Sequence, residues 1–229
     1  YGIPYTVETY GIIYNNAIME KYFALDGAVV KSMDEINSYD KLKEVVEDMT
    51  AKKKDLGIDG VFASTSLKPG EDWRWQTHLA NLPIYYEYKD NKVSDMDKIE
   101  FKYAEHYKNI LDLYMDNSVS EKGLLGSVDV ATSMAEFALG QCAMVQNGNW
   151  AWSQISEVDG NTVKAEDIKF MPIYFGVDDE NEGLCTGTEN FWCINSQASK
   201  EDIQSTKDFL TWLTTDSEGK AYMYKSTDD

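Results

Sequence analysis

Residues 138–152 read Ala138-Leu-Gly-Gln-Cys-Ala-Met-Val-Gln-Asn-Gly-Asn-Trp-Ala-Trp152. The small residues that end at Gly140 favour the end of a helix, because glycine adopts the left-handed conformation that commonly closes one. The apolar run from Cys142 to Val145 predicts a strand. Asn147-Gly148 is typical of a tight turn with positive φ. We expect residues 150–155 to be helical.

The two tryptophans of this stretch, Trp150 and Trp152, are expected to have different surroundings. Residues two apart on a helix point about 200° apart around its axis, so the two indoles cannot share one face. Open α/β sheets bind ligands beyond the ends of their strands, which is where this helix is expected to start. We therefore expect one of the two indoles to enter the core and the other to face the ends of the strands.

The composition fits a globular protein with a strongly acidic surface. The chain has 229 residues, of which 43% are hydrophobic, and 40 Asp and Glu against 21 Lys and Arg give a net charge of −19. This charge disfavours nucleic acid and anionic membrane surfaces as partners, because both are negatively charged. No apolar run approaches the ~20 residues of a membrane span.

Three cysteines, Cys142, Cys185 and Cys193, have no spacing that suggests a metal site. Cys142 and Cys193 lie in apolar strand patterns, so we expect both to be buried. His78 and His106 are isolated histidines, and neither has a neighbour that implies catalysis. The sequence therefore predicts no metal, no cofactor and no catalytic residue.

The rest of the chain alternates between strand and helix patterns. Ser32 and Glu35 form a candidate capping box. An apolar helix stripe follows at Leu42, Val45, Val46 and Met49, and Gly57 is expected to stop that helix. The other expected elements are strands at 5–14, 60–64 and 168–173, helices at 71–82, 103–116 and 130–139, a hairpin over 85–92 and a last helix opened by Ser199. Alternating strands and helices indicate an α/β fold.

A second group of candidate functional residues lies in Pro69-Gly-Glu-Asp-Trp-Arg-Trp-Gln-Thr-His78. Trp73 and Trp75 are two apart at a helix start, so one of them is poorly placed to enter the core. Arg74 is the single arginine of the chain. Its planar fork suits paired hydroxyls or a carboxylate, although a surface ion pair with a neighbouring acid is the simpler interpretation.

Three stretches together resemble the extracellular solute-binding proteins of ABC sugar importers, the maltose-binding-protein-like family. The first is the run from Gly140 to Trp150, which contains Gly-x-x-Ala-Met and Asn-Gly-x-Trp. The second, residues 1–15, is similar to the first strand that crosses between the two lobes in that family. The third, residues 191–199 with the following helix and residues 214–219, is similar to the return into the first lobe.

This resemblance implies an α/β, periplasmic-binding-protein-like (type II) lobe with crossing segments. Residues 1–13 would form an interdomain crossing strand, 14–175 the second ligand-binding lobe, and 176–229 the return crossing with part of the first lobe. The chain would then be a piece of a longer protein.

The resemblance also implies where a ligand binds. The family uses the aromatic that matches Trp150 as a platform for a sugar ring, so we expect Trp150 to contact ligand and Trp152 to pack in the core. The family also places a carboxylate and an aromatic at the positions of Glu71 and Trp73. Glu8 resembles a glutamate that contacts ligand in the family. The predicted ligand-binding residues are Glu8, Glu71, Trp73, Arg74, Trp75, Asn147, Trp150 and Glu189.

These residue types suit a sugar for physical reasons. The apolar C–H face of a pyranose lies against an indole, while its hydroxyls point sideways toward carboxylates and amides. Such a site discriminates strongly, because a missing hydroxyl leaves a buried polar group unpaired.

The predicted function is a non-catalytic carbohydrate receptor that closes around an oligosaccharide and delivers it to the permease subunits of an ABC importer. The resemblance implies an extracellular location, as a lipoprotein on a Gram-positive cell surface or in a periplasm, with membrane contact only through a lipid anchor outside this sequence. Two alternatives stay open. A glycoside hydrolase or lyase would need two carboxylates roughly 5–10 Å apart, and a peptide or polyamine receptor would share the fold.

Overall fold

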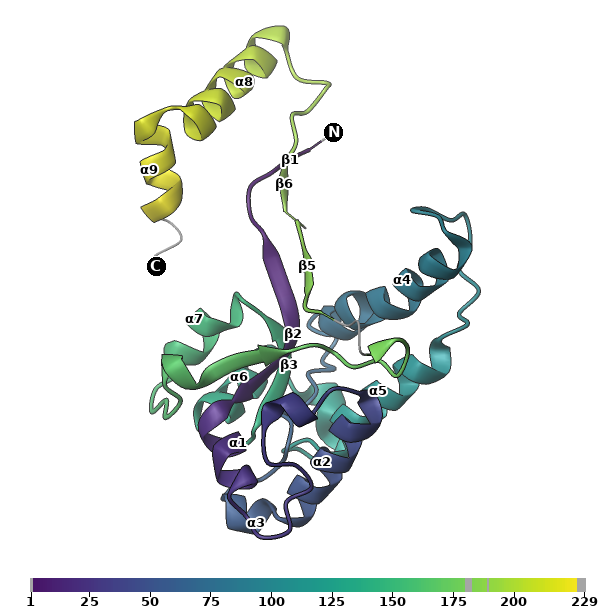
Figure 1. Ribbon diagram of the computed structural model, residues 1–229. Coiled ribbons are helices and arrows are strands. Elements are labelled where there is room, and N and C mark those ends of the chain that lie inside the picture. The colour runs from purple at the N-terminus through teal and green to yellow at the C-terminus, as the bar shows by residue number, and fades with distance from the viewer. Residues whose placement is uncertain (1, 180–182, 189, 226–229) are drawn as a thin grey trace. The chain divides into compact units, whose positions relative to one another are not determined.

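The computed structural model describes residues 2–179, 183–188 and 190–225. The chain divides into two compact units, of which Glu8–Thr186 forms the larger and Tyr1–Val7 with Gly187–Asp229 forms the smaller. The larger unit contains most of the helices and a four-stranded sheet (Figure 1). The crossing role expected for residues 1–13 and 176–229 stays a prediction.

The sheet of the larger unit is built around β2 (Glu8–Asn15). β3 (Met144–Gly148) and β4 (Ile168–Met171) pair with β2 in antiparallel fashion, one on each side, and β5 (Cys185–Gly187) also pairs with β2. Successive side chains of a strand point to opposite faces of a sheet. Ile12 and Ile13 are both buried, and they belong to two different hydrophobic cores.

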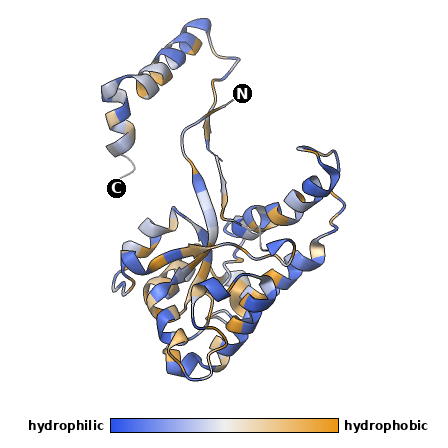
Figure 2. Ribbon diagram, viewed as in Figure 1, coloured by the Kyte–Doolittle hydropathy of each residue, from blue (hydrophilic) through white to orange (hydrophobic). Residues whose placement is uncertain are grey.

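Helices cover both faces of this sheet. The core that contains Ile12 also takes in the buried sides of α1 (Asn16–Phe23), α2 (Tyr39–Ala51), α3 (Lys53–Leu56), α4 (Ala80–Asn91) and α5 (Ala104–Asp116). The core that contains Ile13 takes in α6 (Val130–Ala138) and α7 (Ala151–Ser156). Figure 2 shows that these helices carry hydrophobic and hydrophilic residues together, as expected for helices with one buried side.

Helix α2 confirms the predicted apolar stripe, because its four members are all fully buried. Each such side chain contributes roughly 1.5–3 kcal/mol by leaving water. The capping box expected at Ser32 is wrong as the start of this helix: Ser32 precedes only the single 3₁₀ turn η1 (Met33–Glu35), and its side chain makes no cap bond. Ser38 caps α2 instead, accepting a hydrogen bond from the N–H of Lys41 at 3.2 Å. Gly57 ends the following turn with φ +74°, as predicted.

The hairpin predicted over residues 85–92 is wrong, because residues 85–91 belong to α4 and Lys92 is its left-handed C-cap. Within α4, the buried carboxylate of Glu87 accepts hydrogen bonds from the N–H groups of Glu100 at 2.7 Å and Lys102 at 2.8 Å, so it ties the helix to the segment that follows. The helix expected over 71–82 begins later, at Arg74, as the π-helical segment η2 (Arg74–Leu79) that continues into α4.

The predicted turn at Asn147-Gly148 is also wrong. Both residues lie in β3, where Asn147 pairs with Gly11 and Gly148 with Tyr10. Gly140 does close α6 with φ +72°, as predicted. The short strand expected at 60–64 is reduced to Phe62, which forms isolated parallel bridges with Ser118 and Met144.

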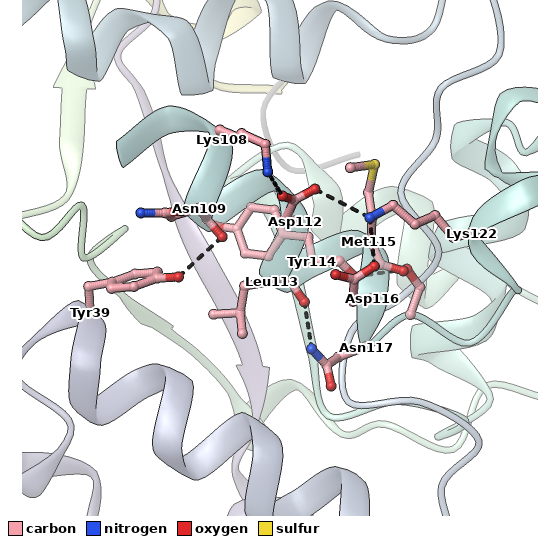
Figure 3. A network of polar contacts seen from close by, with 11 residues as sticks. Tyr39, Lys108, Asn109, Asp112, Leu113, Tyr114, Met115, Asp116, Asn117 and Lys122 are labelled. Carbon is pink, nitrogen blue, oxygen red and sulfur yellow. Dashed lines mark hydrogen bonds and ion pairs between the residues drawn. The ribbon is translucent and has the colours of Figure 1, made fainter. Parts of the chain in front are cut away.

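A network of polar contacts joins α5 to its neighbours (Figure 3). Asp112 pairs with Lys108 on the same helix, and it also pairs at 3.3 Å with Lys122 of η3 (Lys122–Ser127). These hydrogen bonds, that of Lys108 foremost, lower the pKa of the Asp112 carboxyl. On the other side, the Tyr39 hydroxyl of α2 donates to the Asn109 carbonyl at 3.2 Å. The network therefore ties three segments of the larger unit together.

The smaller unit is a two-stranded pairing followed by two helices. β1 (Ile3–Pro4) pairs with β6 (Phe191–Trp192), and Tyr5 stacks on Trp192 with ring centroids 4.6 Å apart. The helices are α8 (Lys200–Thr215) and α9 (Ser217–Lys225). Ser199 caps α8 as predicted, although α8 is not the last helix. Cys193 is exposed, which corrects the expectation that it is buried, whereas Cys142 is buried as predicted. Across the described ranges, no helix has both the length and the apolar character needed to cross a membrane.

Candidate ligand-binding site

The connection from β3 into α7 positions Trp150. The N–H of Asn149 donates to the Thr9 carbonyl at 2.9 Å, and the N–H of Thr9 donates to Asn149 Oδ1 at 3.2 Å, so the connection is held to β2. The half-buried Trp150 lies over Gly148, where a Cβ atom would come within 2.2 Å of the indole. The glycine of the Asn-Gly-x-Trp motif therefore serves close approach of a ring, and not a turn.

Four aromatic side chains, Tyr10, Trp73, His78 and Trp150, form one group that we call the aromatic cluster. Tyr10 and His78 stack with ring centroids 4.2 Å apart. Trp73 meets His78 edge-on at 4.9 Å, and Trp150 lies 5.4 Å from His78 and 6.1 Å from Trp73. The cluster thus brings together two predicted site residues that are far apart in sequence, Trp73 and Trp150. Trp73 is 38% exposed, which leaves an indole surface open to a ligand.

His78 and Tyr10 are members of this cluster that sequence reasoning missed. His78 is buried among the other three rings, which corrects its interpretation as an isolated histidine. Hydrogen bonds in a π-helix join residues five apart, whereas those in an α-helix join residues four apart. His78 lies five positions after Trp73, the residue that caps η2. No sequence pattern indicates a π-helix here, so the sequence does not predict the ring contact between Trp73 and His78.

Arg74 is buried at 3% exposure, which corrects the expected surface ion pair. Its Nε donates to Asn147 Oδ1 at 3.0 Å, and its Cζ lies 4.0 Å from the centroid of the Trp73 ring. Burial lowers the pKa of Arg74 to about 10, against an opposing effect of Glu71, so the guanidinium stays charged at neutral pH. A desolvated cation on an indole face is a favourable contact. Arg74 therefore supports Trp73 from within the protein.

Asn147 is 1% exposed, so its amide acts on protein groups in this structure. Its Oδ1 accepts hydrogen bonds from Arg74 Nε and from the N–H of Gly148 at 3.0 Å. Its Nδ2 lies 3.5 Å from Gln154 Oε1 of α7. Asn147 thus links Arg74, the glycine beneath Trp150, and α7. Direct contact of Asn147 with ligand stays a prediction.

Glu71 is half-buried and fixes the start of α6. Its Oε2 accepts a hydrogen bond from the N–H of Val130 at 2.8 Å, a favourable place for an anion because helix N-termini carry positive partial charge. Lys68 lies 3.6 Å from Oε1 of the same carboxylate. Oε2 is therefore occupied by a hydrogen bond within the protein, and Oε1 forms an ion pair with the partly exposed Lys68.

A hollow of about 360 Å³ lies between α6 and α7. Val130, Met134 and Gln154 are among its lining residues. Val130 is the hydrogen-bond partner of Glu71, and the amide of Asn147 contacts the other two. The hollow therefore adjoins two of the predicted site residues.

The remaining predicted residues differ in their accessibility. Trp75 is 5% exposed and its indole N–H donates to the Ser66 carbonyl at 3.1 Å, so it is a core residue here. Glu8 is half-exposed at the start of β2. Glu189 lies outside the described residues. Trp152 is 42% exposed, so its predicted place in the core is wrong: α7 is short and buries Ala151 and Ile155 instead.

Among the residues that the structure describes, no cluster of His, Cys, Asp and Glu could hold a metal ion. Cys142 and Cys193 are free thiols, the first buried and the second exposed. What the site offers is an indole surface, a supporting cation and a carboxylate.

The sequence profile of a family described as "Bacterial extracellular solute-binding protein" matches residues 1–228. The chain belongs to this family. The family is bacterial and extracellular by its description, which agrees with the resemblance seen in the sequence. No curated protein sequence is significantly similar to the chain.

Solved structures share the fold at low sequence identity. A chitin oligosaccharide binding protein is 19% identical with a TM-score of 0.64, over 94% of this chain and 50% of its own. Maltose-bound MalE3 of T. maritima is 17% identical with a TM-score of 0.56, over 93% and 50%. BlMnBP2 of Bifidobacterium animalis subsp. lactis ATCC 27673, solved with mannotriose, is 16% identical with a TM-score of 0.54, over 94% and 48%.

These likenesses confirm the predicted α/β, periplasmic-binding-protein-like (type II) fold of this solute-binding protein. The chain spans about half the length of the solved structures it matches.

Proposed function

We propose that this solute-binding protein contributes an oligosaccharide-binding surface to a non-catalytic receptor of an ABC importer. The observation that carries the proposal is the aromatic cluster, in which Trp73 presents an exposed indole 6.1 Å from Trp150. Glu71, which precedes Trp73 by two residues and Arg74 by three, supplies a carboxylate whose charge acts on Arg74. An apolar plate beside a hydrogen-bonding acid is the chemistry that a sugar ring requires.

The solved structures with the same fold support a sugar as the class of ligand. Their printed names include a chitin oligosaccharide binding protein and proteins in complex with maltose and mannotriose. Receptors of this fold close around ligand. Ligand contacts that form only in the closed state shift the population toward that state. We propose that the closed state delivers sugar to the permease subunits, from a lipid-anchored position on a Gram-positive surface or from a periplasm.

Catalysis is disfavoured by what Glu71 does. A glycoside hydrolase needs two carboxylates flanking the scissile bond, one acting as a proton donor. Glu71 instead holds the N–H of Val130 with one oxygen and faces Lys68 with the other. A polyamine receptor is the competing ligand class, because the net charge of −19 attracts cations.

The test is calorimetry of the full-length protein against chito-, manno- and malto-oligosaccharides, with spermidine and a mixed peptide pool as competitors. We expect micromolar affinity for one sugar series, on the order of −8 kcal/mol. Heat from spermidine or peptides without heat from any sugar would sink the proposal, as would release of reducing ends during incubation.

Trp150→Ala is expected to remove most of the affinity while the protein stays folded. The matched control is Trp152→Ala, since Trp152 is an exposed tryptophan only two residues away that is outside the aromatic cluster. Equal losses in both variants would show that the cluster is not the binding surface.

A further inference from the structure

A small cavity adjoins Arg74, and four buried polar atoms in its walls are unsatisfied. They are Thr65 Oγ1, Arg74 Nη1, Tyr114 Oη and Gln146 Oε1, and none has a hydrogen-bond partner among the described residues. All four residues line this same cavity. Buried polar groups in native proteins are nearly always hydrogen-bonded to protein or to ordered water. Four such atoms around one cavity therefore point to something that binds there.

The size of the cavity selects the occupant. The centre of a water molecule can move within about 10 Å³ of it, which is room for one water. The hydrogen-bonding groups agree with this size. Arg74 Nη1 can only donate, whereas the hydroxyls of Thr65 and Tyr114 can donate or accept. A water molecule accepts two hydrogen bonds and donates two, so it can satisfy all four atoms.

Gln146 argues for water over a small anion. Its Nε2 lies 3.4 Å from the Arg74 carbonyl, which orients the amide so that Oε1 is the atom left without a partner. An anion would face this carbonyl oxygen and gain nothing from it, whereas water can donate a hydrogen bond to it.

We propose that one ordered water occupies this cavity and holds the guanidinium of Arg74, which in turn positions Trp73 and Asn147. The guanidinium is committed at three places. Nε is bound to Asn147 Oδ1 at 3.0 Å, and Cζ lies 4.0 Å from the Trp73 ring centroid. Nη1 is the buried atom without a partner, and Arg74 lines the cavity. A shift of the guanidinium would therefore move the indole that forms the exposed part of the aromatic cluster. Arg74 is a positioning residue in this scheme, because it is itself buried.

The water is tested first, without any sugar. A high-resolution crystal structure of the full-length protein is expected to show one oxygen atom within hydrogen-bonding distance of the four atoms. Tyr114→Phe removes one of its partners and is expected to weaken that density and to shift the NMR signal of the Trp73 indole N–H. Tyr222→Phe, on the exposed surface of α9, is the control and should change neither. A dry cavity, or a halide recognised by its anomalous scattering, would overturn the assignment.

The positioning role is tested by a double-mutant cycle, and only this part rests on the proposed function. Arg74→Lys keeps the charge but loses the planar fork, and we expect sugar affinity to fall about tenfold. In a Trp73→Ala background the same substitution is expected to cost little, because its effect passes through the indole. An equal loss in both backgrounds would overturn the positioning role.

The two proposals fail separately. If no sugar binds but Arg74→Lys still shifts the Trp73 indole signal, the receptor proposal fails and the positioning role stands. If sugar binds and Arg74→Lys leaves that signal unmoved, the positioning role fails and the receptor proposal stands.

Discussion

Glu136 of α6 accepts two hydrogen bonds from Ser64, one from its N–H at 2.6 Å and one from its hydroxyl at 2.8 Å. Ser64 is in turn bound by its neighbours, since its hydroxyl accepts from the N–H of Ser120 at 2.9 Å and its carbonyl accepts from the Ser133 hydroxyl at 2.6 Å. All these contacts join segments far apart in sequence. A buried carboxylate thus organises the part of the larger unit where α6 meets the segment leading to Thr65.

Removal of this carboxylate is expected to be strongly destabilising. Glu136→Ala leaves the N–H of Ser64 buried without a partner, so we expect a loss of about 2–4 kcal/mol in the free energy of unfolding. Urea denaturation followed by circular dichroism measures it. Glu157→Ala, which removes an exposed carboxylate from the end of α7, is the control. Similar midpoints for the two variants would contradict this reading of Glu136.

The close contact of Trp150 with Gly148 gives a second prediction. A methyl group at residue 148 would lie 2.2 Å from the indole, so Gly148→Ala must displace Trp150. Overpacking of this kind costs about 1–3 kcal/mol, and we expect sugar affinity to fall because the aromatic cluster is disrupted. Calorimetry with the best sugar ligand measures the loss. Gly123→Ala has open space around its new methyl group and should bind normally. Unchanged affinity in Gly148→Ala would show that the ring position is unimportant.

Much of the fold could be predicted from local patterns. The apolar stripe of α2, the cap at Ser199 and the left-handed Gly140 all depend on neighbouring residues, and all are confirmed. The failures arose where distant partners override local preference. In α4, where a hairpin was expected, the carboxylate of Glu87 accepts hydrogen bonds from N–H groups 13 and 15 residues away, and local patterns do not reveal such partners.

The candidate site also contains some features that local sequence predicts and others that depend on residues far apart in the chain. Trp73 and Trp150 could be found from the spacing of tryptophans and from the family resemblance, and the structure brings them together. The burial of Arg74 could not be found, because an arginine beside acids normally remains in water. Its place depends on Asn147, a residue 73 positions away, and on the face of Trp73. Whether all the predicted residues bind ligand stays a prediction.

A third prediction concerns acid stability. Hydrogen bonds from the Thr132 side chain and N–H, with a further one from Lys68, lower the pKa of Asp129 to about 2, whereas an unfolded Asp has a pKa of about 3.9. A lowered carboxyl pKa stabilises the fold above the unfolded pKa, and this contribution is lost as pH falls from about 4 to about 2. Asp129→Asn should therefore lower the Tm at neutral pH, and the difference from wild type should shrink across this range.

Thermal melts between neutral pH and pH 2 test this assignment. Asp97→Asn, at an exposed position outside the cap of α6, is the control. A difference between wild type and Asp129→Asn that stays constant from neutral pH to pH 2 would mean that the ionised cap of α6 does not contribute.

A fourth prediction concerns the smaller unit. The Ser199 hydroxyl accepts from the N–H of Asp202 at 3.1 Å and donates to the Asp202 carboxylate at 2.7 Å, so one residue satisfies a free donor at the start of α8. Ser199→Ala should cost about 1 kcal/mol and let the first turn fray. Amide hydrogen exchange of residues 200–203 measures this directly. Ser196→Ala, in the exposed segment before the helix, is the matched control. Because the effect is local to the first turn, exchange in the middle of α8 should change much less than exchange at its start. If exchange accelerates uniformly along the helix, the cap stabilises the whole unit and the local effect predicted here is wrong.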